Sequence, residues 1–274
     1  MSSQGLTAYD FVQQVYYAQE KVILDFYPED DKFKEVLMEA NLVLQELQNS
    51  EDWTWLRDRL VLGPCMQRPG KIPEFDLPDW VYKPSMINHD CIYLHKMIPF
   101  CMEPDMRHYI SVPLASTGDN AYHKERQMTG FGVIHATDPK LRAIRVGDTI
   151  TFNRLLTPFE AHSIAIMDVQ RRIEQFHICN QDCEFQEVNG HQVCTKELDE
   201  EGHERKHLQV IPDPNYVIMA TAARHAEGSP PALARIAGLQ DAAQKIMSAM
   251  RQNDASATDA DWQDWEIPGY YEVI

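Results

Sequence analysis

Residues 203–207 read His-Glu-Arg-Lys-His and match the H-E-x-x-H pattern of zinc peptidases. In that pattern two histidines bind zinc and the glutamate acts as the general base. The ligands here would be His203 and His207, and the base would be Glu204. Glu227 follows on a second expected helix, at a spacing that suits a third ligand. A zinc-dependent hydrolase is therefore one function that the sequence allows.

The local structure of this segment decides whether the motif can bind metal. On a helix, residues i and i+4 lie about 6 Å apart on one face, whereas in a strand they lie about 13 Å apart. Gly202 disfavours a helix interior, and Pro212 limits the length of any helix. The flanking residues are charged and show no apolar period. The sequence thus predicts that 202–208 is an extended, solvated strand without a bound metal.

A hairpin is expected just before this motif. Asn189-Gly190 is a strong signal for a two-residue turn between CEFQEV and HQVCTKEL. Such a turn pairs residue 188 with residue 191 and residue 185 with residue 194. DEEG at 199–202 is expected to form a second turn, so that 183–211 becomes a three-stranded meander.

The hairpin carries a second group of residues that could bind metal. Its register places Cys183 and Cys194 on one face as diagonal neighbours, about 7–8 Å apart. Cys179 could join them, while His191 points to the opposite face. This gives three thiols and no clear fourth ligand, whereas a structural zinc site needs four. The alternative is that the cysteines are small buried hydrophobic residues.

Composition narrows the classes of function. The chain has 274 residues, 44% of them hydrophobic, and a net charge of −17. This charge argues against binding to nucleic acid phosphates or to an anionic membrane. No stretch approaches the roughly 18 apolar residues of a membrane span. Six irregularly spaced cysteines are typical of reduced thiols in a cytoplasmic setting. No cofactor motif is evident.

The apolar period predicts helices at both ends of the chain. The first two cover 7–25 and 32–49, and two more cover 212–227 and 232–252. The apolar stripe of the second helix consists of Phe33, Val36, Leu37, Ala40, Leu44 and Leu47.

Between these ends, recurrent prolines exclude long helices over 64–157, where HYISVPL, GFGVIHAT and LRAIRVGDTITFNRLL are typical of strands. Thr157, Pro158 and Glu160 form the start signal of a further helix over 158–176. The fold class is therefore α+β, a helical bundle from the N- and C-terminal helices with a β-rich middle and an inserted β-meander. The expected organisation is a helical core (1–63 and 212–252), a β-rich region (64–157), a helix with the meander (158–211), and a linker with an aromatic arm (253–274).

The order of these elements resembles a known family. The pieces are ANLVLQELQNSEDWTWLRDRLVL, LPDWVYKP, RVGDTITFNRLLTPFEAHSIAIMDVQRRIEQF and DPNYVIMATAARHAEGSPPALARIAGLQDAAQKIMSAMRQ. They are similar to the head-to-tail adaptors (tail tubular protein A-like) of tailed bacteriophages. The resemblance covers about 10–64 and 212–252 well and the middle by architecture. It contains no catalytic signature.

The resemblance implies a structural, non-enzymatic protein of the virion. Members form a ring, commonly a dodecamer, between the portal protein and the tail tube or nozzle protein, and are assembled in the host cytoplasm. DNA passes through the ring without specific binding, and an acidic channel would repel its phosphates. The alternatives are the gluzincin-like hydrolase and a cytoplasmic interaction module with a Cys-rich metal knuckle.

The C-terminal arm is the expected docking element. Its large apolar residues are Trp262, Trp265, Ile267, Tyr270 and Tyr271, after an acidic linker. The apolar area that they could bury roughly balances the entropy of ordering the segment. The arm therefore needs a preformed groove, either on its own subunit or on the portal or a neighbouring adaptor.

Overall fold

The structure is a computed structural model that describes residues 5–21, 25, 27–65, 72–85, 90–97, 104–115, 123, 140–180, 182–226 and 235–256. Its contacts divide the chain into two compact units. Among the described residues, the helical unit comprises 5–55 and 173–256, and the β unit comprises 56–172. The fold class is α+β, as the sequence predicts. No described helix is long and apolar enough to cross a membrane.

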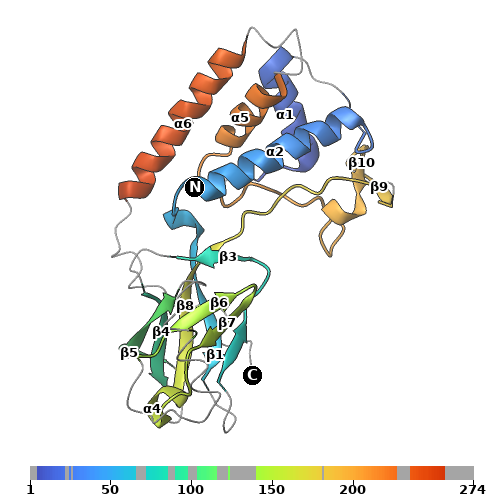
Figure 1. Cartoon of the computed structure of the whole chain (residues 1–274). Helices are drawn as coiled ribbons and strands as arrows, with labels where there is room; N and C mark the ends of the chain where they lie inside the picture. The colour runs from blue at the N-terminus through green and yellow to red at the C-terminus, as the bar shows by residue number, and fades with distance from the viewer. Residues whose placement is uncertain are drawn as a thin grey trace. The chain divides into compact units, whose positions relative to one another are not determined.

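The helical unit is built from both ends of the chain (Figure 1). Its helices are α1 (Ala8–Glu20), α2 (Asp31–Ser50), α5 (Asn215–Ala226) and α6 (Ile236–Ser256). The short α5 contacts all three of the others. Its alanines permit this close approach, since a small side chain keeps the helix axes near one another.

The apolar stripe expected on the second helix is confirmed. All six predicted residues, Phe33, Val36, Leu37, Ala40, Leu44 and Leu47, are buried on α2. The helix ends at Ser50, and the buried Trp53 donates its indole N–H to the carbonyl of Leu47 at 2.7 Å. This bond satisfies one of the free carbonyls in the last turn of the helix. A 3-10 turn (Thr54–Leu56) follows.

The β unit contains an eight-stranded, mostly antiparallel sheet (Figure 1). Its strands are β1 (Arg57–Pro64), β2 (Glu74–Asp76), β3 (Val81–Pro84), β4 (Asp90–Met97), β5 (Pro104–Ala115), β6 (Ala143–Val146), β7 (Thr149–Phe152) and β8 (Ser163–Arg171). Their order is β1-β8-β4-β5-β6-β7-β2, and β3 also pairs with β8. One cluster of buried apolar side chains, among them Ile92, Leu94, Ile150 and Phe152, forms the core.

The helix predicted over 158–176 is wrong beyond its first turn. The capping box is present: the Glu160 amide donates to Thr157 Oγ1 at 3.3 Å, and the Thr157 amide donates to the Glu160 carboxylate at 2.7 Å. However, α4 covers only Pro158–Ala161, and β8 follows at once. This strand is buried on both faces and pairs with β1, β3 and β4. An apolar run of this kind has no polar face, so its period cannot separate helix from strand.

The three-stranded meander is also corrected. Residues 183–211 contain one hairpin, formed by β9 (Phe185–Val188) and β10 (His191–Cys194). The expected third strand is replaced by turns and two isolated bridges, one between Leu198 and Glu204 and the other between Leu6 and His207. The last bridge ties this segment to the residues just before α1. The strand predicted over GFGVIHAT (130–137) lies outside the described residues.

Candidate metal centre

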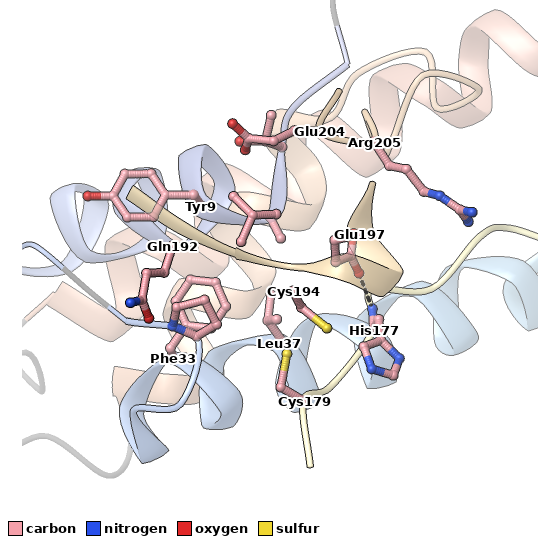
Figure 2. Close-up of a pocket in the computed structure, with 14 residues that line it drawn as sticks. Tyr9, Phe33, Leu37, His177, Cys179, Gln192, Cys194, Glu197, Glu204 and Arg205 are labelled. Atoms are coloured by element: carbon pink, nitrogen blue, oxygen red, sulfur yellow. Dashed lines mark hydrogen bonds between the residues drawn. The ribbon is translucent and has the colours of Figure 1, made fainter. Parts of the chain in front are cut away.

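Four potential metal ligands meet in the helical unit. They are His177, Cys179, Cys183 and Cys194, and their ligand atoms all lie within 4.8 Å of one another. No other group of three or more such residues forms in the part of the chain that the structure describes. Figure 2 shows the sulfur atoms of Cys179 and Cys194 turned toward each other next to Leu37 of α2.

The hairpin places Cys194 as the sequence predicts. Residue pairs 188 with 191 and 185 with 194 face each other, so the predicted register is confirmed. Asn189 and Gly190 both have positive φ angles, 52° and 87°, as a tight turn of this type requires. The pairing continues with a hydrogen bond from the Thr195 amide to the Glu184 carbonyl at 2.9 Å. Cys194, at the end of β10, is buried.

A short turn holds Cys183 near Cys179. The Cys183 amide donates to the carbonyl of Asn180 at 3.2 Å, and the Asn180 side chain accepts from the Asp182 amide at 3.2 Å. The Cys183 thiol also lies 3.2 Å from the same side-chain oxygen. Asn residues favour such turns because their side chains bond to the backbone two residues on. The turn folds Cys183 back beside the thiol of Cys179.

His177 is the fourth member of the group, and the sequence reasoning missed it. Its Nε2 lies 3.4 Å from the sulfur of Cys183. Its amide donates to Glu197 Oε1 at 2.6 Å, a bond drawn in Figure 2. The available signal was the H-x-C spacing with Cys179, since residues i and i+2 of an extended segment project to the same side.

Three free thiols in this setting have different acidities. Burial raises the pKa of the Cys179 thiol, and the thiols of Cys194 and Cys183 raise it further. Burial also raises the pKa of Cys194. For Cys183 the main influence is a backbone hydrogen bond from Asn180, which lowers the pKa. The surroundings thus favour the thiolate form at Cys183 and the neutral thiol at Cys179 and Cys194.

The space beside the cluster is too small for an organic substrate. The cavity has a volume of about 20 Å³ and is lined by Tyr9, Phe33, Leu37 and the two buried cysteines of the cluster, among others. This volume holds about one water molecule. Closed sites with N and S ligands and no open position are typical of structural zinc, whereas catalytic sites keep one position for water or substrate. The arrangement can therefore bind an ion but offers little room for chemistry on a substrate.

The two histidines of the H-E-x-x-H motif diverge. The segment is not helical. The His203 side chain is 80% exposed and lies 3.7 Å from Asp199, whereas the His207 side chain is 2% exposed and pairs with Glu197 at 2.5 Å. The expectation of a solvated strand is therefore wrong for His207, because this side chain also packs its ring against Phe176, with centroids 4.5 Å apart. Glu227 lies outside the described residues.

Glu204 is held by two side chains of the hairpin. Its Oε1 accepts from Asn189 Nδ2 at 3.1 Å, and its Oε2 lies 3.2 Å from His191 Nε2. His191 in turn stacks on Tyr9, with ring centroids 4.1 Å apart. His191 thus lies away from the cysteine cluster, as the hairpin register predicts.

We expect Glu204→Gln to cost about 1–2 kcal/mol of unfolding free energy, because the amide keeps only one oxygen acceptor for two partners. Urea unfolding measures this cost. His203→Gln, at an exposed position, is the control and should change the free energy by less than about 0.5 kcal/mol. With added zinc, both variants should give the same rate of peptide hydrolysis as the wild type. A zinc-dependent peptidase activity that Glu204→Gln abolishes would contradict this reading.

The expected docking residues of the C-terminal arm, Trp262, Trp265, Ile267, Tyr270 and Tyr271, lie outside the described residues.

Models of known protein families give no match to this chain, and curated protein sequences give none either.

Proposed function

We propose that this chain is a non-enzymatic, ring-forming head-to-tail adaptor of a tailed bacteriophage. In this role it joins the portal protein to the tail tube or nozzle protein in the neck of the virion. The observation that carries the proposal is that, among the described residues, the helical unit is built from the N-terminal and C-terminal helices, and the residues of the β unit lie between them in the sequence. This organisation agrees with the sequence resemblance, which rests on the same terminal helices.

The surface of α2 supports a subunit contact. Met38 and Leu42 lie one turn apart on the side of α2 away from its buried stripe, and their exposed fractions are 51% and 47%. Tyr17 on α1 is similarly exposed. Neighbouring exposed apolar side chains on a helix are a common basis for protein contacts. In a ring, this face of α2 would meet the adjacent subunit.

The charge of the chain supports a passive role toward DNA. A net charge of −17 repels phosphate, so a ring of such subunits would let DNA slide without binding it. The hydrolase alternative loses its support from the motif, because His203 is exposed while His207 is buried against Glu197.

A second candidate function is an interaction module with a metal knuckle. The observation that favours it is the cluster of three cysteines and a histidine. The two candidates differ in assembly, since a module of this kind needs no ring.

The test is assembly with the portal protein of the same virus. We expect native mass spectrometry and electron microscopy of the co-expressed proteins to show a ring of this chain stacked on the portal. The chain alone should be a monomer or a weakly associated ring. A tight dimer as the only species under both conditions would overturn the proposal.

We expect the double variant Met38→Glu, Leu42→Glu to weaken ring formation at least about 100-fold, because it replaces two apolar contacts with charges that must be desolvated. The circular dichroism spectrum should stay unchanged, since both positions are exposed. Val146→Glu in the β unit, also exposed, is the matched control. Rings that form at wild-type concentrations in the double variant would exclude the α2 face as the subunit contact.

A further inference from the structure

We propose that His177 Nε2 and the sulfur atoms of Cys179, Cys183 and Cys194 bind one structural Zn²⁺ ion. The ion would connect the segment after β8 to the β9–β10 hairpin, beside α1 and α2. This inference does not depend on the adaptor function, because a ring subunit and an interaction module could both contain such a site.

The distances suit a tetrahedral zinc ion. Bond lengths of about 2.3 Å to sulfur and 2.0–2.1 Å to nitrogen place two sulfurs about 3.8 Å apart and a sulfur and a nitrogen about 3.5 Å apart. The observed separation between His177 Nε2 and Cys183 Sγ is 3.4 Å. The widest separation in the group is at most 4.8 Å. Binding therefore requires side-chain shifts of about 1 Å or less.

The ligand types favour zinc over harder cations. Three thiolates and one imidazole are soft or borderline ligands, whereas Mg²⁺ and Ca²⁺ prefer oxygen. A Cys₃His set is also a complete four-ligand shell for structural zinc. A disulfide is a poorer explanation of the geometry, because it would join two of the three sulfurs and leave the third sulfur and the histidine without a role. Cys179, Cys183 and Cys194 are all free in the structure.

Glu197 orients the histidine side of the site. One carboxylate oxygen accepts from the His177 amide at 2.6 Å, and the other lies 2.5 Å from His207 Nε2. Glu197 stands in the 3-10 turn (Thr195–Glu197) that directly follows Cys194. The buried Glu197 carboxylate thus connects the segment that contains His177 with the segment that contains Cys194. His207, the second histidine of the H-E-x-x-H motif, supports the cluster through its contact with Glu197.

The location of the cluster indicates a structural role. Tyr9 of α1 and Phe33 and Leu37 of α2 line the same small cavity as Cys179 and Cys194 (Figure 2). A bound ion would hold these two cysteines against the helices. It would also secure the segment that pairs with Leu6 through the bridge to His207.

The first test measures metal in the full-length protein. Purified protein, reduced and then dialysed with zinc, should contain one zinc per chain by elemental mass spectrometry. Replacement with Co²⁺ should give the visible absorption bands of tetrahedral cobalt and a thiolate-to-cobalt charge-transfer band. Less than about 0.1 zinc per chain, or bound cobalt without the charge-transfer band, would overturn the proposal.

A variant pair separates the site from general thiol chemistry. Cys183→Ser alters the least buried of the three cysteines and should weaken zinc binding at least about 100-fold in competition with a chromophoric chelator. Cys65→Ala removes a buried free thiol of the β unit and should leave zinc binding unchanged. Zinc should also raise the midpoint of thermal unfolding for wild type and Cys65→Ala, but not for Cys183→Ser. Equal zinc affinity in wild type and Cys183→Ser would contradict the assigned ligands.

Oxidation is the competing outcome. If mass spectrometry of the protein purified without reductant shows two cluster thiols joined in a disulfide, and the reduced protein still binds no zinc, the cluster is a redox pair and the proposal fails. A ring that assembles without zinc would leave the adaptor function standing, so failure of one proposal can be distinguished from failure of the other.

Discussion

Glu160→Gln is expected to lower the unfolding free energy of the β unit by about 3–5 kcal/mol, since it leaves a buried arginine without its counter-charge. Two hydrogen bonds of 2.8 Å join the Glu160 carboxylate to both terminal nitrogens of Arg154. The exposed fractions of these side chains are only 10% for Arg154 and 8% for Glu160. A bidentate pair of this kind satisfies both groups at once, and the amide of glutamine cannot reproduce it.

The effect of Glu160→Gln should depend on pH. Burial alone would raise the pKa of Glu160, but hydrogen bonds from Arg154 and from the Thr157 backbone, together with the charge of Arg154, lower it overall. A carboxyl with a depressed pKa in the folded state contributes stability that is fully present above its unfolded pKa, about 4.3. That contribution is lost as the pH falls through the folded pKa. The difference between wild type and Glu160→Gln should therefore be largest near neutral pH and shrink in acid.

Urea unfolding with amide hydrogen exchange in β7 and β8 measures this difference within the β unit. The matched control in the same unit is Asp148→Asn, which breaks a pair between Arg145 and Asp148 in which the Asp148 side chain is 77% exposed. Such surface pairs contribute about 0–1 kcal/mol. A loss below about 1 kcal/mol for Glu160→Gln at neutral pH would mean that the Arg154 pair does not stabilise the fold.

Asn41→Leu is expected to cost about 2–5 kcal/mol in the helical unit. The side-chain amide of Asn41, on α2, donates to the carbonyl of Phe176 at 2.9 Å, and its oxygen accepts from the Phe176 amide at 2.9 Å. Phe176 is buried and packs its ring against Phe11 of α1, with centroids 4.7 Å apart. Leucine would leave both buried backbone groups of Phe176 unpaired, at about 1–3 kcal/mol each.

The control for Asn41→Leu is Asn49→Leu on the same helix. Asn49 is exposed, and its amide donates to the carbonyl of Gln45 within α2. Its replacement should change the unfolding free energy by less than about 0.5 kcal/mol, because water can take the place of the lost partner. Urea unfolding followed by circular dichroism distinguishes the two variants. Equal costs at both positions would show that helix propensity, not the bonds to Phe176, explains the effect.

Local signals in the sequence were sufficient for several elements. The apolar stripe of α2 and the turn at Asn189-Gly190 each depend on residues a few positions apart. The period of a helix and the positive φ angles of a two-residue turn are properties of the chain itself. For this reason the buried residues of α2 and the pairing of residue 185 with residue 194 could be predicted. The same applies to the capping box of Thr157 and Glu160.

Tertiary contacts decided the rest. Residues 163–171 form a strand because β1, β3 and β4 surround them, and an apolar run buried on both faces contains no period that could show this in advance. His177 lies beside the cysteines because two side chains that are distant in sequence bind the local backbone. Glu197 accepts from the His177 amide, and Asn41 accepts from the Phe176 amide. His207 is likewise buried against Glu197 because of tertiary packing, which its spacing from His203 does not reveal. Spacing along the chain determines which side chains can share a local face. Whether they meet as ligands depends on partners far away in sequence, whose positions are set only when the core closes.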